Sequence, residues 1–186
     1  NRFIRKNMKR FVKSPVINRI PYTANLKEER YEIRFSGSGG QGIIMAALIF
    51  AEAVGVYDGK HVCQSQNYGP EARGGVSQAE VVISTQPIDY PKAIKLDLLL
   101  AMNQISCDNN FMDLKPEGLL VVDSGLVEQT PTGRVVALPF TRLARQVAER
   151  ELAANMVALG AVGYLSQAVS LKSLEMALLS RFPKGT

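Results

Sequence analysis

The chain has 186 residues, of which 46% are hydrophobic, and a mean hydropathy of +0.00, which together predict one globular domain with a substantial core. The formal net charge of +5 is concentrated in residues 1–20, which hold seven basic and no acidic residues, so nucleic-acid binding by the near-neutral remainder is not expected. Apolar stretches such as 156–165 are short and interrupted by glycine, and no signal peptide is recognisable, so we expect a cytoplasmic protein with no membrane span.

Residues 1–30 are interpreted as a basic N-terminal arm ahead of a single domain over residues 31–186. Apolar residues interleave with the positive charges of the arm, and Pro15 and Pro21 interrupt regular structure. The arm is either a solvated tail or a segment that lies on a partner subunit, and the sequence favours neither.

A glycine-rich stretch organises the start of the domain: Ser36-Gly37-Ser38-Gly39-Gly40-Gln41-Gly42. An alternating segment before it predicts a strand over 31–35. A segment rich in small and apolar residues after it predicts a buried helix over 41–54, with Gly55 as its C-cap. Strand, glycine turn and helix are the opening unit of an open α/β sheet. Because glycines allow close backbone approach and a helix start has free N–H groups, the turn suits a phosphate or a carboxylate.

The glycines at 37, 39 and 42 fit the spacing G-x-G-x-x-G, which is a weak signal by itself. A dinucleotide-binding fold also has an acidic residue at the end of its second strand, whereas the strand predicted over 61–66 ends in Gln64-Ser65-Gln66. Asp58 precedes that strand instead. A nicotinamide dinucleotide site is therefore disfavoured, and the turn either cradles an anion or partner cofactor or only packs the helix on the strand.

The elements after the turn predict a single three-layer α/β/α domain with a mostly parallel sheet. The loop 67–75 is too short for a crossover helix, so the strands over 61–66 and 76–84 are expected to be antiparallel, which makes the sheet mixed. Residues 115–118 are interpreted as a helix exit, Thr141 as an N-cap, and Asn155 as an N-cap or first-turn residue. The other predicted elements are strands over 96–101, 119–123 and 134–138 and helices over 106–114, 141–150, 155–169 and 171–181.

The loop Tyr68-Gly69-Pro70-Glu71-Ala72-Arg73-Gly74-Gly75 carries the second set of candidate binding groups. Gly74 and Gly75 could form an anion-binding concavity beside the Arg73 guanidinium, and Glu71 could pair with that guanidinium. The alternative is a structural or subunit-contact loop.

No catalytic or metal-ligating set is recognisable in the chain. Cys63 and Cys107 form no C-x-x-C motif and are expected to be inert thiols in a reducing compartment. His61, the only histidine, is interpreted as structural or exposed. A Ser-His-Asp set and a P-loop lysine are also missing, so we assign no catalytic residue and no metal site to this chain.

The motif Gly39-Gly40-Gln41-Gly42, together with the stretch from Gln64 to Gly75, resembles the gamma subunit of the 2-oxoacid:ferredoxin oxidoreductases. The Tyr68–Gly75 segment is most similar to the 2-oxoglutarate branch. The resemblance extends from about Tyr31 to the end of the chain and implies a fold like domain III of pyruvate:ferredoxin oxidoreductase. It implies a binding set of Gly37, Ser38, Gly39, Gly40, Gln41, Gly42, Ser65, Gln66, Tyr68, Glu71, Arg73, Gly74 and Gly75.

The reaction that the resemblance implies is the coenzyme A-dependent oxidative decarboxylation of a 2-oxoacid, with ferredoxin as electron acceptor. Alpha and beta subunits with thiamine diphosphate and Mg²⁺, and [4Fe-4S] clusters including those of a ferredoxin-like delta subunit, would be the partners. Asn109-Asn110 lacks the preceding Gly-Asp-Gly of a thiamine site and is interpreted as helix surface. Coenzyme A is the candidate ligand of this chain, which is expected to be inactive alone. The alternatives are a purely structural adaptor and a stand-alone nucleotide-binding oxidoreductase.

Overall fold

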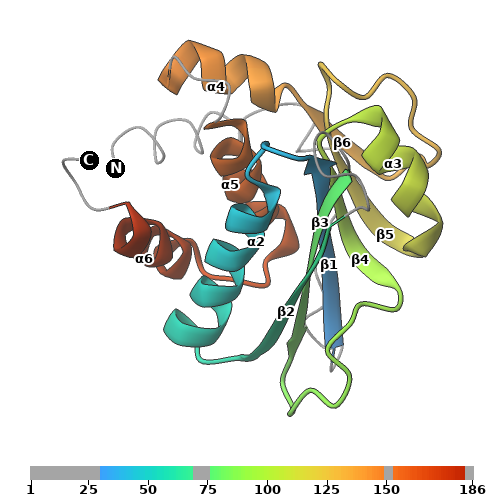
Figure 1. Ribbon diagram of the computed structural model, residues 1–186. Coiled ribbons are helices and arrows are strands. Elements are labelled where there is room, and N and C mark those ends of the chain that lie inside the picture. Colours follow the sequence, from blue (N-terminus) through green and yellow to red (C-terminus); the bar gives the residue numbers. More distant parts are fainter. Residues whose placement is uncertain (1–29, 69–75, 149–152, 183–186) are drawn as a thin grey trace.

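A computed structural model describes residues 30–68, 76–148 and 153–182 (Figure 1). Its elements in chain order are β1 (Arg30–Ser38), α2 (Ile43–Glu52), the π-helical turn η2 (Ala53–Tyr57), β2 (His61–Tyr68), β3 (Val76–Ser84), β4 (Leu96–Ala101), α3 (Gln104–Asn110), the 3₁₀ turn η3 (Phe111–Asp113), β5 (Leu114–Asp123), β6 (Val135–Leu138), α4 (Phe140–Ala148), α5 (Ala154–Ser166) and α6 (Leu171–Arg181).

The six strands form one mixed sheet in the order β2-β3-β1-β4-β5-β6. Neighbouring strands from β1 through β4 and β5 to β6 are parallel. Strand β3 is antiparallel to both β1 and β2, so it alone opposes the common direction. The predicted antiparallel pairing of the strands on either side of the loop 67–75 is therefore confirmed, because that loop leaves no room for a crossover helix.

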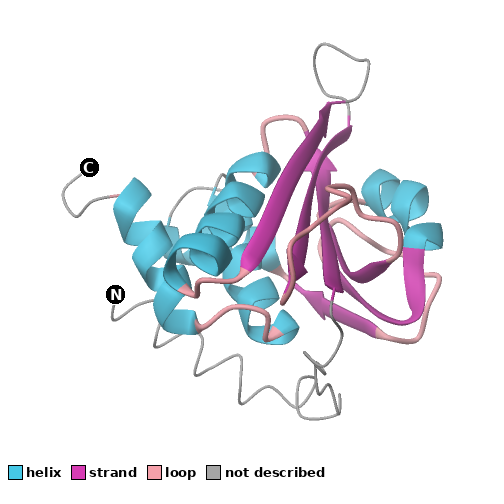
Figure 2. Ribbon diagram, turned by 90° about the horizontal axis from the view of Figure 1, so that it is seen from below, coloured by secondary structure: helices cyan, strands magenta, loops and turns pink. Residues whose placement is uncertain are grey.

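Helices cover both faces of the sheet, which confirms the predicted three-layer architecture. Helices α2, α5 and α6 lie on one face and α3 lies on the other (Figures 1 and 2). Strand β1 shows why the layers form: Ile33 and Phe35 are fully buried with α2, while the alternate residues Arg34 and Ser36 bond to α3. Strand β4 is buried at every position because both of its faces are covered.

Three local predictions were wrong. Gly55 is not a C-cap, because α2 continues into η2, and a Cβ at Gly55 would lie 2.6 Å from Val62 Cγ1, so the glycine permits close helix–strand packing. Residues 115–118 belong to β5 and are not a helix exit. Thr141 lies inside the first turn of α4 and does not precede it. The Asp123 carboxylate accepts hydrogen bonds from Thr141 N and Oγ1 at 2.8 and 2.6 Å, so the acid at the end of β5 completes this helix start.

Candidate functional site

The predicted glycine turn lies at the carboxyl ends of β1 and β4. The helix after β1, α2, packs on one face of the sheet, and the helix after β4, α3, packs on the opposite face (Figure 1). In open α/β sheets, the crevice outside such a pair of strands is the usual ligand-binding position. The topology therefore places the turn at the expected site of the fold.

Two glycines of the turn adopt backbone conformations that other residues rarely take. Gly40 and Gly42 have φ of +88° and +68°. A Cβ at Gly42 would also collide with Asn155 Nδ2, whereas a Cβ at Gly40 would meet nothing within 4 Å. Gly37 is extended as part of β1, and its Cβ would lie 2.6 Å from Gln41 Oε1. The turn thus needs glycine for conformation at Gly40, for space at Gly37 and for both at Gly42.

Amide side chains hold the turn in place. Ser38 N donates to Gln41 Oε1 at 2.6 Å, so the side chain of Gln41 closes the turn on itself. Asn103 Nδ2 donates to Ser38 Oγ at 2.7 Å from the start of α3, and Asn155 Nδ2 donates to the Gly42 carbonyl at 3.0 Å from the first turn of α5. The sequence interpretation did not identify Asn103 as a contact of the turn. It placed Asn155 correctly in the first turn of a helix but did not identify the Gly42 carbonyl as its hydrogen-bond partner.

The start of α2 carries positive potential that no protein side chain neutralises in the described residues. Its N-cap is Gly42, which makes no side-chain cap hydrogen bond, and the first turn contains no acidic residue. The helix macrodipole and the N–H groups of this turn favour a negative group at this position. Met45, in the same turn, is 40% exposed, so solvent reaches this helix start.

The ends of the second predicted binding loop lie at the same edge of the sheet. Tyr68, the last residue of β2, is opposite Ser77, and Val76, the first residue of β3, is opposite Ser38. Ser38 closes β1 directly before Gly39 and Gly40, so both segments begin from paired strands. Four predicted binding residues lie outside the described residues: Glu71, Arg73, Gly74 and Gly75.

The remaining predicted binding residues, Ser65 and Gln66, lie within β2. Ser65 is three residues before the end of the strand, which is about 10 Å along it. Its hydroxyl donates to Glu80 Oε2 at 3.4 Å on the α3 side of the sheet. Gln66 is exposed and pairs in the ladder with Ala79, whose side chain faces the α2 side. The structure therefore does not bring Ser65 to the glycine turn.

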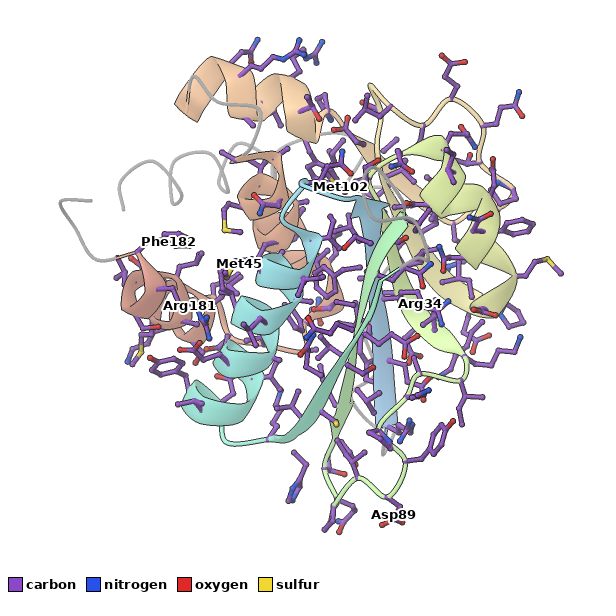
Figure 3. All side chains as sticks on the ribbon, viewed as in Figure 1. Arg34, Met45, Asp89, Met102, Arg181 and Phe182 are labelled. Carbon is purple, nitrogen blue, oxygen red and sulfur yellow. The ribbon has the colours of Figure 1, made fainter. Side chains whose placement is uncertain are left out.

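A buried polar cluster lies between the sheet and α3. Arg34 is 8% exposed and pairs with Glu80 at 2.7 Å and with Asp113 (Figure 3). Burial alone would lower the pKa of Arg34, but the hydrogen bonds and charges of Asp113 and Glu80 outweigh it and raise that pKa. Asn110 joins this cluster and is 2% exposed, so its interpretation as helix surface was wrong. Asn109, its neighbour, is exposed as predicted.

A surface hollow of about 440 Å³ lies beside the start of α3, lined by Gln104, Gly125, Leu126, Glu128 and Gln129. Gln104 Oε1 accepts from the N–H groups of Glu128 and Gln129 at 3.0 and 3.1 Å, which fixes the loop after β5 against α3. The hollow therefore lies between the start of α3 and the loop after β5, and no residue of the glycine turn lines it.

Features that would suggest redox or metal chemistry are not found among residues 30–68, 76–148 and 153–182. That part of the chain contains no group of three or more His, Cys, Asp or Glu residues placed to hold a metal ion. Cys107 is fully buried, and burial and the nearby Asp108 raise the pKa of its thiol, which disfavours the reactive thiolate. None of the described helices is both long and apolar enough to cross a membrane.

Comparison with known proteins adds two sequence matches. Residues 32–186 match the family described as pyruvate ferredoxin/flavodoxin oxidoreductase. The chain is 47% identical over 161 residues to the 2-oxoglutarate synthase subunit KorC of Methanocaldococcus jannaschii, a match that covers 84% of this chain and 86% of the relative.

Two solved structures share the fold. The gamma subunit of a keto/oxoacid ferredoxin oxidoreductase from Geobacter sulfurreducens PCA has a TM-score of 0.77 and 48% identity, over 84% of this chain and 87% of that one. The 2-oxoglutarate:ferredoxin oxidoreductase from Magnetococcus marinus, with 2-oxoglutarate, coenzyme A and succinyl-CoA bound, has a TM-score of 0.76 and 25% identity. That match covers 86% of this chain but 28% of the longer chain.

Proposed function

The chain belongs to the pyruvate ferredoxin/flavodoxin oxidoreductase family and is a gamma subunit of a 2-oxoacid:ferredoxin oxidoreductase; from that premise we propose that its complex oxidises 2-oxoglutarate and that this chain docks coenzyme A. The resemblance inferred from Gly39–Gly42 and the stretch 64–75 is thereby confirmed at the level of the family. The substrate proposal is supported by the Methanocaldococcus and Magnetococcus relatives, both of which are named for 2-oxoglutarate.

The proposed reaction consumes a 2-oxoacid, coenzyme A and two equivalents of oxidised ferredoxin. The bond between the carboxylate and the keto carbon breaks to release carbon dioxide, and the keto carbon is oxidised and forms a thioester with the coenzyme A sulfur. The electron pair leaves as two reduced ferredoxins, and the thiol proton is released. Thiamine diphosphate would supply the carbon chemistry when bound to partner subunits.

In the part of the chain that the structure describes, no group of three or more His, Cys, Asp or Glu residues could hold a metal ion. Asn110, the second half of the Asn109-Asn110 pair, uses both ends of its amide for hydrogen bonds inside the fold. We therefore place thiamine diphosphate and its Mg²⁺ in alpha and beta subunits, and the [4Fe-4S] clusters in partners that include a ferredoxin-like delta subunit.

The uncapped start of α2 is the observation that carries the docking proposal. Coenzyme A is strongly anionic, and the N–H groups behind Gly42 can donate to one of its phosphates without displacing a protein side chain. Arg73, in the loop whose two ends lie at the same sheet edge as the turn, would add a charge-assisted contact. In this proposal the chain supplies no catalytic group. The chain orients coenzyme A so that its sulfur can attack a carbon held by other subunits of the complex.

An assembly role is the second part of the proposal. In the Magnetococcus protein the matched region is about a quarter of a longer chain, so there the same domain is covalently joined to further structure. Helix α6 also carries the exposed apolar residues Met176 and Leu179, which are 43% and 37% exposed, and Phe182, its C-cap, is 51% exposed (Figure 3 labels Phe182). A subunit that is covered at this helix would not expose them.

The test is purification of the native complex through a tag on this chain, followed by viologen reduction assays with coenzyme A. We expect dye reduction with 2-oxoglutarate that depends on coenzyme A, and an Arg73→Ala complex with intact assembly and a raised KM for coenzyme A. A preference for pyruvate would overturn the substrate proposal. Failed assembly of the Arg73→Ala complex would favour the adaptor alternative, and a single chain without partners that binds NAD would favour the stand-alone alternative.

A further inference from the structure

Asn110 is the last residue of α3 and lies in the interior between α3, β1 and β3. Its Oδ1 accepts from Arg34 Nη1 at 3.1 Å and from Gln78 Nε2 at 2.9 Å. Its Nδ2 donates to Ser36 Oγ at 3.2 Å and to the Ser106 carbonyl at 2.7 Å. One amide thus connects two strands and a helix through four hydrogen bonds.

The strand partners of Asn110 lie directly behind the candidate site. Ser36 and Gln78 are opposite each other in the β1–β3 ladder, two residues before the pair formed by Ser38 and Val76. That second pair is where the glycine turn leaves β1 and where the chain from the loop 69–75 enters β3. The position of the glycine turn relative to the start of β3 therefore depends on the separation and twist of this ladder.

Helix α3 is also bonded to β1 at its other end, where Asn103 Nδ2 donates to Ser38 Oγ. The bond from Asn103 holds Ser38 of the turn, and the bond from Asn110 holds Ser36 in the strand that leads to the turn. Both ends of α3 are therefore bonded to β1. The bond from Asn110 lies farther from the glycine turn than the bond from Asn103. Asn110 can therefore be changed without removing a group that would touch coenzyme A at the turn.

We propose that Asn110 is a positioning residue that sets the geometry of the coenzyme A-docking edge through Ser36 and Gln78. This inference rests on the proposed docking of coenzyme A at the glycine turn. An amide suits the position because its oxygen can accept from Arg34 and Gln78 while its nitrogen donates to the Ser106 carbonyl and to Ser36 Oγ.

A carboxylate is the informative replacement at this position. It could still accept from Arg34 and Gln78, but it could not donate to Ser36 and Ser106. It would also add a third acid to Glu80 and Asp113 around the Arg34 cation. Asn109 on the adjacent, exposed position of the same helix offers a matched control with the same change of charge.

The experiment compares Asn110→Asp with Asn109→Asp in the purified complex and measures KM for coenzyme A and kcat separately. For Asn110→Asp we expect KM to rise about tenfold with kcat changed less than about twofold, the size expected for one or two lost hydrogen bonds. Asn109→Asp should match wild type.

A second variant, Ser36→Ala, keeps the proposal testable if the first does not assemble. It removes one partner of Asn110 without adding charge, and we expect KM for coenzyme A to rise about threefold. If Asn110→Asp and Ser36→Ala lower thermal stability but leave KM unchanged while Arg73→Ala raises it, the positioning role is overturned and the docking proposal stands. If Arg73→Ala also leaves KM unchanged, docking at this edge is overturned, and the positioning role with it.

Discussion

The two helices that start at the carboxyl ends of β1 and β4 differ in how their first N–H groups are satisfied. At α3, Asn103 Oδ1 accepts from Ser106 N at 2.8 Å, so the helix caps itself. At α2, the N-cap is Gly42, and the nearby Asn155 donates to its carbonyl instead of accepting from the helix. Side-chain oxygens are available at this edge, yet the described residues place none as a cap on α2. The first N–H groups of α2 are therefore free to donate to the anion that we propose to bind there.

Replacing Gly42 should have the largest effect. In Gly42→Ala the Cβ collides with Asn155 and φ stays near +68°, so we expect a loss of about 3 kcal/mol or more in the free energy of unfolding. Gly40→Ala has a similar φ but open space, so it should cost about 1 kcal/mol. Urea denaturation of the purified chains measures both, and equal losses would show that Asn155 does not pack tightly on the turn.

Asp123 provides the opposite case, a helix start that is fully satisfied internally. It is 0% exposed and accepts from Thr141 N, Thr141 Oγ1 and Gly125 N. Asp123→Ala removes the acceptor of three part-buried hydrogen bonds, so we expect a loss of about 2 kcal/mol in stability. KM for coenzyme A should be unchanged in assembled complex. A raised KM with unchanged stability would place the anion site at α4 instead of α2.

Met45→Glu should change stability and ligand affinity in opposite directions. An acid in the first turn of α2 interacts favourably with the helix dipole and should stabilise the chain by about 0.5 kcal/mol. The same charge should repel a phosphate and raise KM for coenzyme A about fivefold, equivalent to about 1 kcal/mol. Met45→Gln, which has similar size and no charge, is the control. A KM that is the same in both variants would contradict phosphate binding at this turn.

Asp58 should make a smaller contribution that depends on pH. It accepts from Ser170 N and Ser173 Oγ at 2.7 and 2.5 Å at the start of α6. Burial alone would raise the pKa of Asp58, but the bonds from Ser173 and Ser170 and the charge of Lys60 lower it. The stabilisation is therefore complete above the unfolded value of 3.8 and is lost as pH falls through the lower folded pKa.

The corresponding measurement compares Asp58→Asn with wild type by urea denaturation of the purified chain. At pH 7 we expect the variant to be less stable by about 1 kcal/mol, and at about pH 3 and below we expect the difference to shrink. A difference that stays constant through the acid range would mean that the carboxylate charge is not what stabilises this helix start.

Much of the sheet could be predicted from sequence because its signals are local. The strands 76–84 and 96–101 have their predicted bounds, and the glycine turn lies where strand and helix patterns meet. The boundaries that failed depend on contacts between different elements. Gly55 follows an apolar helix as a C-cap would, but its role is set by Val62 on the next strand.

The sequence interpretation also missed the polar contacts between β1 and α3, for a related reason. The alternation of Glu32, Arg34 and Ser36 with apolar residues in β1 is typical of a strand with one solvated face, yet α3 covers that face. Asn103 and Asn110 are seven residues apart, on one side of a helix, and a polar stripe of this kind matches a polar sheet face. Only the fold shows that the two polar surfaces meet.

The most direct test of the account is a cryo-EM map of the assembled complex with coenzyme A bound. The account predicts that a phosphate of coenzyme A lies within hydrogen-bonding distance of the N–H groups of Ile43 to Met45, with Asn103 still bonded to Ser38 and capping α3. A map in which coenzyme A is ordered but makes no contact with the glycine turn or Arg73 would contradict it, and the open start of α2 would then have no ligand.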